Sequence, residues 1–409
     1  MNTQTRPTLT LSKPEFIALV AMLVAAVAFS IDSMLPAMPQ IAQELTPQDP
    51  NKAQLIITSF VLGMGLGTFF AGPLSDSYGR KPVIIWGAVL YITASALAWL
   101  APSLELVLLA RVLQGVAAAA ARIVPMAMTR DYYAGRGMAR IVSFIMMVFT
   151  LVPAVAPLAG SVIIDAFGWR AIFGVFILFA MVSTLWLTIR VPEPLPHPDR
   201  RPFRPHALWA SASEVLSHRV VMRSTAIQAL CMTALFSSLS TIHQVFDLTY
   251  GRAEGFPWYF CAIALIAGAF SLLNATLVVR LGMRRLVRYA MVMLIGLTLA
   301  MITVNIAFAS AGLPFAAYFA WQLAVFIHTS MTLGNLNAIA LEPMGHIAGM
   351  ATSVFSALAT VGAVILTVPI GLAFNGTPLP LMIGSLGAII LAFVLTQGLP
   401  QDSETDAPA

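Results

Sequence analysis

Residues 72–81 read Gly72-Pro73-Leu74-Ser75-Asp76-Ser77-Tyr78-Gly79-Arg80-Lys81, and they join two apolar runs at residues 53–73 and 82–101. Each run has about 20 residues, the length that an α-helix needs to cross the hydrocarbon core of a bilayer. The joining segment carries charged side chains, and its glycines permit a tight turn and close approach of helices. This stretch therefore predicts two membrane-spanning helices connected by a short, charged loop.

The rest of the sequence has the same character. Hydrophobic residues make up 59% of the 409 positions and charged residues only 10%, with a mean hydropathy of +0.87. A water-soluble domain of this size needs more charged surface than that. The apolar runs number twelve, at approximately 14–38, 53–73, 82–101, 104–129, 138–164, 169–190, 219–246, 256–280, 285–309, 314–341, 347–374 and 379–398. We predict an all-α membrane protein with twelve transmembrane helices.

The distribution of basic residues predicts the orientation of the chain. With the amino terminus in the cytoplasm, 17 of the 22 Lys and Arg residues flank the spans on the cytoplasmic side, and only Lys52, Arg170 and Arg252 lie on the other side. Such a bias is typical of membrane proteins. We expect a multi-pass protein of the bacterial inner membrane with both termini in the cytoplasm. Nucleic acid is not an expected partner, because the basic residues are scattered through loops.

The longest break between spans, residues 191–218, is rich in proline and arginine. We predict an N-terminal six-helix bundle at residues 1–190, a cytoplasmic linker at 191–218 and a C-terminal six-helix bundle at 219–409 that ends in a short acidic tail. A glycine-basic turn precedes the third span, at residues 78–81, and another precedes the ninth, at residues 281–284. This echo favours two related halves.

The loop at residues 72–81 resembles the signature G-x-L-x-D-R-x-G-R-R/K of the major facilitator superfamily. The matching positions include Gly72, Asp76, Gly79, Arg80 and Lys81. Ser77 stands where the family usually has Arg or Lys. The resemblance implies the major facilitator fold, with two six-helix bundles around a central cavity. It also implies that this loop is a cytoplasmic latch between helices, which helps to hold the outward-facing state.

Two further segments resemble the drug:proton antiporters of that superfamily. Residues 111–115, Arg-Val-Leu-Gln-Gly, are similar to their RxxQG signature, and residues 156–160, Ala-Pro-Leu-Ala-Gly, to their antiporter motif. Pro157 and Gly160 would create a kink and a closely packed surface in a helix that rocks, although proline and glycine are also common in membrane helices generally. The resemblance to the Bcr/CflA-type drug-resistance transporters extends to residues 32–39, 168–170, 340–343 and 346–349.

Asp32 is the only carboxylate deep within the twelve runs. A charge at that depth costs about 3 kcal/mol on insertion scales, so it usually has a function and a partner. Arg111 lies at a similar depth in the fourth span, counted at about 1.5 Å of helix rise per residue. We predict that Asp32 carries a proton and that Arg111 pairs with it, directly or through Gln114 or water. The alternative is an ion pair with a purely structural role.

A second group of side chains is predicted to line the substrate cavity: Gln114, Arg122, Met34, Phe236, His328 and Asn335. Arg122 either attracts an anionic or dipolar group of the substrate or extends its charge towards the membrane surface. His328 either titrates near physiological pH or makes a hydrogen bond in helix packing. Methionine and aromatic side chains would supply adaptable apolar surface.

His243 and Asp247 lie four residues apart near the outer end of the seventh span, so they share one face of an α-helix. This spacing suggests an outer gate or a second proton site. A satisfied contact at the membrane boundary is the alternative interpretation.

No enzyme motif occurs in the sequence: there is no Walker loop, HExxH motif or nucleophile elbow. Cys231 and Cys261 form no metal-binding or disulfide pattern, so we expect no cofactor and no metal. The expected protein is a monomer that exports small, largely apolar drugs or toxic compounds in exchange for protons. Alternatives are export of a native metabolite, such as an amino acid derivative or siderophore, and proton-coupled import of a small anion.

Overall fold

The computed structural model describes residues 11–200, 203, 205–307 and 312–399, and these form helices and connecting turns without a strand. Eleven apolar stretches of this described part are long enough to cross a membrane. One of them, Phe315–Leu372, consists of two long helices joined by a short 3-10 helix. The prediction of an all-helical protein with twelve spans is therefore confirmed. The acidic tail predicted after the last span lies outside the described residues.

The chain divides into two compact units, residues 1–37 with 59–210 and residues 38–58 with 211–409. Helices α3 and α8 cross the division, and the others lie within one unit. The helices of the first unit are α1 (Lys13–Asp32), η1 (Leu35–Ala37), α3 (Leu55–Tyr78), α4 (Arg80–Leu100), α5 (Leu104–Tyr132), α6 (Gly135–Phe167), α7 (Ala171–Arg190), η3 (His197–Asp199) and the start of α8 (Pro205–Ser217). The helices of the second unit are α2 (Met38–Leu45), η2 (Pro50–Gln54), α9 (Arg219–Gln244), η4 (Val245–Thr249), α10 (Phe256–Leu281), α11 (Met283–Ala307), α12 (Phe315–Leu341), η5 (Glu342–Ile347), α13 (Ala348–Leu372) and α14 (Leu379–Thr396).

The predicted boundary at 191–218 stays a prediction, and the two units depart from it in one place. Residues 38–58 lie with the second unit, because their polar side chains have partners there. The Asn51 amide donates to the carbonyls of Leu372 and Phe374, and the Gln54 amide donates to the carbonyl of Gly371 and to the side chain of Gln244. Helix α8 is a further element that the proline-rich composition of 191–218 did not predict.

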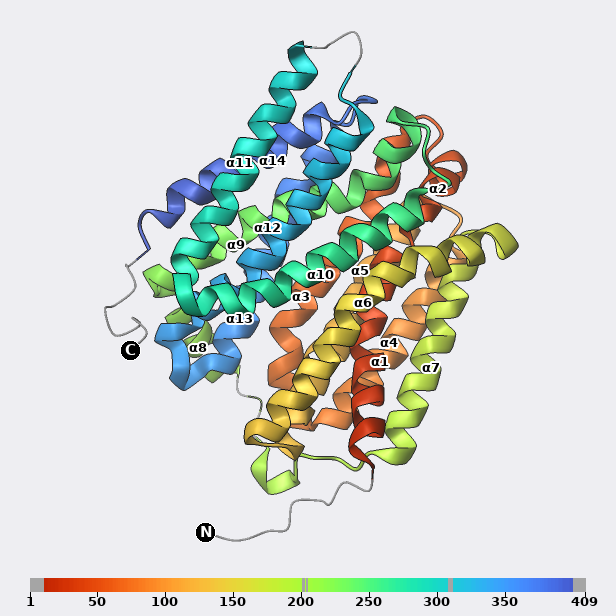
Figure 1. Cartoon of the computed structure of the whole chain (residues 1–409). Coiled ribbons are helices and arrows are strands. Elements are labelled where there is room, and N and C mark those ends of the chain that lie inside the picture. The colour runs from red at the N-terminus through yellow and green to blue at the C-terminus, as the bar shows by residue number, and fades with distance from the viewer. Residues whose placement is uncertain (1–10, 201–202, 204, 308–311, 400–409) are drawn as a thin grey trace. The chain divides into compact units, whose positions relative to one another are not determined.

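The first unit packs through small residues. Figure 1 shows α1, α4 and α7 side by side. Helices α3 and α5 cross so closely that a Cβ atom on Gly115 would lie 2.0 Å from the carbonyl oxygen of Phe60, and one on Gly63 would lie 2.0 Å from that of Val112. Close backbone approach of this kind is how helices gain van der Waals contact in a bilayer.

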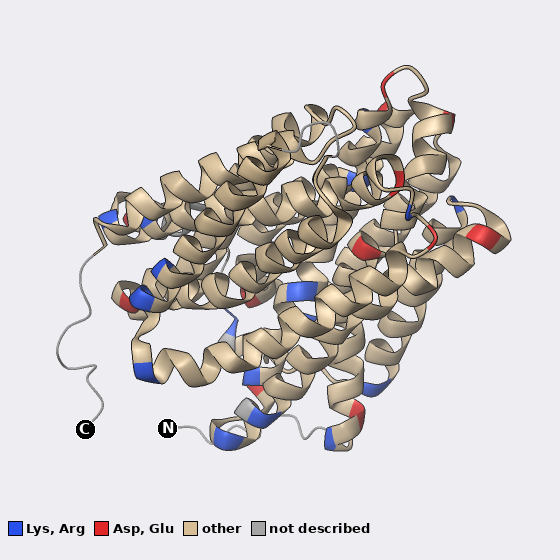
Figure 2. Ribbon diagram, turned by 45° about the horizontal axis from the view of Figure 1, so that its top comes forward, with Lys and Arg blue, Asp and Glu red and all other residues tan. Residues whose placement is uncertain are grey.

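The second unit is organised around α9, which is buried along nearly its whole length and packs against α12, α13 and α14. On both units, charged residues lie mainly near helix ends and loops, and long parts of the ribbon carry none (Figure 2). Large apolar side chains such as Trp86, Leu100 and Leu272 are exposed. Surfaces of this composition are suited to lipid rather than water.

Candidate functional site

Helix α1 ends at Asp32. Pro36 has no N–H group to donate to the carbonyl of Asp32, so the α-helical hydrogen bonding stops there and the chain continues as the short 3-10 helix η1. The Asp32 side chain is 5% exposed. No described residue forms a hydrogen bond or an ion pair with its carboxyl group. Asp32 is thus a buried, unpaired acid at a break in a membrane-spanning segment.

Arg111 on α5 is fully buried, but it does not pair with Asp32. Its Nη1 donates to Gln114 Oε1 at 2.5 Å, and its Nη2 donates to the carbonyl of Ser30 at 2.9 Å. Its guanidinium carbon lies 4.4 Å from the ring centre of Phe60. Neither arginine donor bond reaches a carboxylate. Two residues along an α-helix are separated by about 200° at 3.6 residues per turn, so Ser30 and Asp32 face nearly opposite ways. The predicted direct pair is therefore absent from this structure.

A hydrogen-bond network continues from Arg111 across the first unit. Gln114 donates through Nε2 to Ser95 Oγ at 2.7 Å, and Ser95 donates to the carbonyl of Tyr91. The Tyr91 hydroxyl and Ser30 Oγ lie 2.5 Å apart. Arg111 and Gln114 together therefore hold α1, α4 and α5 in register. The two residues predicted for proton coupling and the cavity belong to a packed network rather than an open space.

The antiporter motif in α6 lies directly against the break in α1. A Cβ atom on Gly160 would lie 2.3 Å from the carbonyl oxygen of Ser33, the residue after Asp32. Pro157 and Pro153 interrupt the hydrogen bonding of α6 about one and two turns before Gly160. The structure thus brings Asp32 and the motif at 156–160 together, which are far apart in the sequence.

The loop at 72–81 is the centre of a charge network. Arg80 pairs with Asp76, and its Nε donates to Asp131 on α5 at 2.8 Å. The carboxylate of Glu193 accepts hydrogen bonds from the backbone N–H groups of Arg80, at 2.9 Å, and Lys81, at 2.8 Å. These are the first N–H groups of α4, where a negative charge is favoured by the helix dipole. The network connects α3, α4 and α5 with the segment that follows α7.

Glycine permits the turn in this loop. Gly79 has a φ angle of 102°, and a Cβ atom there would lie 3.0 Å from Glu193 and 2.9 Å from Arg200. Lys81 Nζ donates to the carbonyls of Thr188 and Val191. Gly72, one turn before Asp76, accepts a hydrogen bond from Ser75 Oγ through its carbonyl. Glu193 was not among the predicted site residues, and its only local signal in the sequence is an acidic residue between two prolines after an apolar run.

The second unit repeats part of this arrangement. Gly282 has a φ angle of 77°, and Arg284 Nη2 donates to Glu342 Oε2 at 3.0 Å. Glu342 directly follows α12, and Asp131 is the penultimate residue of α5. Each glycine-basic turn thus directs an arginine to an acid at the end of the next spanning helix. The sequence echo between residues 78–81 and 281–284 could have led to both acids.

The remaining candidates differ in exposure. Met34 is fully buried, and Arg122 is exposed with its Nη1 3.8 Å from Met64 Sδ, its one hydrogen-bond contact with a described residue. In the second unit Phe236 is 7% exposed. His328 is fully buried, and neither ring nitrogen has a hydrogen-bond partner among the described residues. Asn335 donates to Asn274 Oδ1 at 2.9 Å, a contact between α12 and α10.

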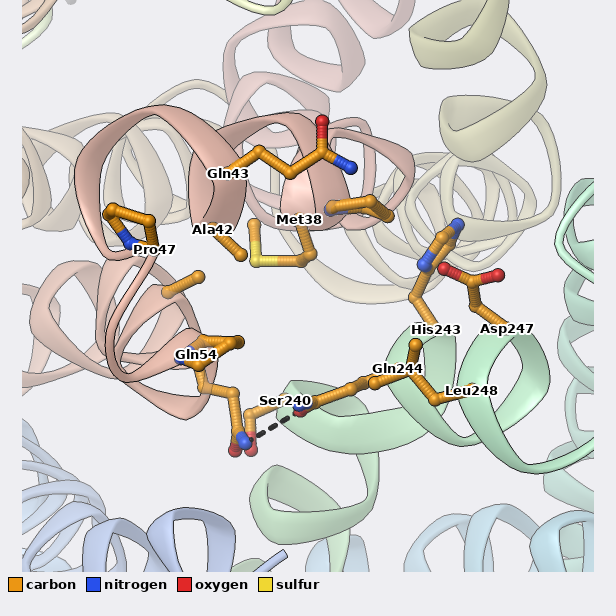
Figure 3. Close-up of a pocket in the computed structure, with 13 residues that line it drawn as sticks. Met38, Ala42, Gln43, Pro47, Gln54, Ser240, His243, Gln244, Asp247 and Leu248 are labelled. Atoms are coloured by element: carbon orange, nitrogen blue, oxygen red, sulfur yellow. Dashed lines mark hydrogen bonds between the residues drawn. The ribbon is translucent and has the colours of Figure 1, made fainter. Parts of the chain in front are cut away.

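His243 and Asp247 line one pocket of about 340 Å³ within the second unit. Figure 3 shows both side chains directed from α9 and η4 towards α2, with Met38, Ala42 and Gln43 opposite them. Residues 245–249 form a π-helix, which is wider than an α-helix. His243 and Asp247 nevertheless line the same pocket. Whether they form a gate stays a prediction.

Comparisons with known proteins agree with this arrangement. The sequence profile of the Major Facilitator Superfamily matches residues 18–367. A bicyclomycin resistance protein homolog from Haemophilus influenzae is 28% identical over 68% of this chain and 69% of its own length. Multidrug resistance protein MdtL from Shigella dysenteriae is 29% identical over 79% of this chain and 80% of its own length. A chloramphenicol resistance protein from Pseudomonas aeruginosa is 36% identical over 38% of this chain and 37% of its own length.

Among solved structures, a D-xylose-proton symporter is similar in fold, with a TM-score of 0.72 at 15% identity, over 97% of this chain and 100% of the symporter. The predicted two-bundle transporter fold is confirmed by this similarity together with the helix content. The chain belongs to the major facilitator superfamily and is a multi-pass membrane transporter with relatives named for drug resistance.

Proposed function

We propose that the protein exports small, largely apolar drugs or toxic compounds in exchange for protons, by alternating access. The names of three relatives, which refer to bicyclomycin, chloramphenicol and multidrug resistance, support the substrate class. The observation that carries the proton coupling is the Asp32 carboxyl group, which is buried at the end of α1 and has no partner in the part of the chain that the structure describes.

The placement of Asp32 suits a proton carrier. A buried carboxylate without a cation partner is costly, and the carbonyl end of a helix adds to that cost. Binding a proton removes the charge, and exposure to water on opening of the protein lowers the cost of releasing it. Arg111 is occupied by Gln114 and Ser30, so it acts on the site from a distance and positions α1 against α5.

The contact between Gly160 and Ser33 connects this chemistry to movement. Any rocking of α6 relative to α1 must change the surroundings of Asp32, because the two backbones touch one residue after it. The conformational change can therefore alter both the water access and the charge state of Asp32. This coupling is what an antiporter requires.

The direction and location of transport form part of the proposal. The bias of basic residues supports a cytoplasmic amino terminus in a bacterial inner membrane, and the antiporter motif supports export. The protein would act as a monomer and without a cofactor. Export of a native metabolite uses the same site and is the nearest alternative.

A second candidate function rests on Arg122. Arg122 as a residue is exposed, and its guanidinium group has no acidic partner among the described residues, which favours contact with an anionic or dipolar substrate group. This is the feature that an importer of small anions would use. Arg122→Ala should then weaken the binding of anionic ligands, and unchanged affinity across a panel would remove this candidate.

Asp32→Asn tests the main proposal. In weakly buffered solution, purified wild-type protein is titrated with neutral, cationic and anionic compounds, chloramphenicol among them, and proton release is recorded. Compounds that bind are then followed in proteoliposomes with an imposed pH gradient. We expect Asp32→Asn to lose both proton release and uphill transport but to keep exchange of substrate for substrate.

The matched control is Asp165→Asn, which changes an exposed carboxylate on α6 of the same unit. It should transport as the wild type does. Retained exchange shows that the Asp32 variant is folded. Uphill transport by Asp32→Asn at the wild-type rate would exclude Asp32 as the proton carrier.

A further inference from the structure

The second unit contains a pocket with the features of a ligand site, separate from Asp32. It lies between α2 and the junction of α9 with η4, and its volume is about 340 Å³ (Figure 3). Pockets of about 300 Å³ and more hold small organic molecules. Most of the lining is apolar, and Met38 is an adaptable part of it.

Two lining groups have unused hydrogen-bonding capacity. His243 is 4% exposed, its ring packs against Phe256 at 4.7 Å between centroids, and its Nδ1 has no partner among the described residues. Asp247 is the one charged residue of the lining, and among the described residues only its backbone carbonyl, not its carboxylate, accepts a hydrogen bond. Both side chains are directed into the pocket in Figure 3.

The other polar groups of the pocket are largely occupied. Gln54 donates to Gln244 Oε1 at 2.9 Å and to the Gly371 carbonyl at 3.0 Å, and Gln244 donates to Asn51 Oδ1 at 2.7 Å. These bonds hold η2, α9 and α13 together before a ligand arrives. A pre-formed wall of this kind reduces the ordering cost of binding.

We propose that this pocket binds a protonated amine with a compact apolar body. The ammonium group would donate to the Asp247 carboxylate and to a ring nitrogen of His243, while the apolar body fills the space beside Met38 and Ala42. An anion would meet an unpaired carboxylate there, and a neutral compound would gain only the apolar contact. The proposal concerns binding alone, so it does not depend on proton coupling or on the direction of transport.

The experiment compares three probes that share one apolar cage: 1-adamantanamine, 1-adamantanol and 1-adamantanecarboxylate. Binding to the full chain in lipid nanodiscs is measured by isothermal titration calorimetry, with empty nanodiscs as the blank. We expect the amine to bind more tightly than the alcohol by about tenfold or more, which is the value of one charge-assisted hydrogen bond. The carboxylate should not bind above the blank.

The variants assign the site. Asp247→Asn should lower the affinity for the amine by about tenfold or more and leave that for the alcohol unchanged, which also shows that the pocket is intact. Ala42→Phe should weaken both by filling the space. Glu254→Gln, which changes an exposed acid outside the lining, and Asp32→Asn should bind the amine as the wild type does.

Three results would overturn the proposal. The first is no binding of the amine above the empty nanodisc. The second is equal affinity of the wild type and Asp247→Asn for the amine. The third is loss of binding in Asp32→Asn with retention in Asp247→Asn, which would place the amine at the other acid.

Discussion

Gly160→Ala tests the contact between the antiporter motif and the end of α1. The new Cβ atom would lie 2.3 Å from the carbonyl oxygen of Ser33 and 3.0 Å from its carbonyl carbon and its Cα. Ordinary van der Waals contact begins near 3.4 Å, and all three clashing atoms belong to the backbone. No side-chain rotation can relieve such a clash, so α6 and the segment at Ser33 must move apart.

The expected loss in the free energy of unfolding is the difference between two effects. Overpacking of a closely packed interior costs about 1–3 kcal/mol, and a backbone clash on both sides belongs at the upper end of that range. Replacing glycine by alanine within a helix returns up to about 1 kcal/mol. The net destabilisation is therefore about 2 kcal/mol. For 150–250 residues each kcal/mol corresponds to about 2–4 °C, so the first unit should unfold about 4–8 °C lower.

The assay is thermal unfolding in detergent, followed by circular dichroism and by tryptophan fluorescence, since five of the seven tryptophans lie in the first unit. Gly137→Ala is the matched control, because Gly137 lies on the same helix and has no atom within 4 Å of its Cβ position. It should unfold at or above the wild-type temperature. If Gly160→Ala unfolds at the temperature of Gly137→Ala, the close contact with Ser33 does not limit stability and the reasoning is refuted.

Two further substitutions test the networks of the first unit. Glu193→Ala removes the carboxylate at the amino terminus of α4 and should lower the free energy of unfolding by about 1–2 kcal/mol in the same assay. Glu254→Ala is a surface control that should lower it little. Equal stability of the two variants would contradict the capping role. Arg111→Lys retains the charge, but one ammonium group cannot replace both the forked contacts to Gln114 and Ser30 and the stacking on Phe60. Uphill transport should therefore fall at least about tenfold. A wild-type rate would show that charge alone suffices.

Local sequence patterns predicted the membrane helices well. A run of about 20 apolar residues must satisfy its backbone hydrogen bonds within the bilayer, and a helix does this without help from other segments. The loop at 72–81 was also recognisable from the sequence, because Gly79 and its charged neighbours interact within one turn of the chain. The echo at 281–284 had the same local basis, and in the structure both turns direct an arginine to an acid.

The partners of buried polar groups were not predictable in this way. Similar depth suggested that Asp32 and Arg111 would pair, but depth leaves the rotation of each helix undetermined. Arg111 instead binds the carbonyl of Ser30. The capping of α4 by Glu193 depends on where the chain passes after α7, which hydropathy does not report.

The sequence by itself determined that this protein is a twelve-span membrane transporter, because hydrophobic length, basic-residue bias and the loop motif are local properties of the chain. Tertiary structure decided that Asp32 has no partner among the described residues and precedes Ser33, which contacts Gly160. It also decided that residues 38–58 join the second unit to form a pocket with His243 and Asp247. These features depend on which helix faces meet. That choice follows from packing small residues and satisfying polar groups across the whole unit, which no single segment specifies.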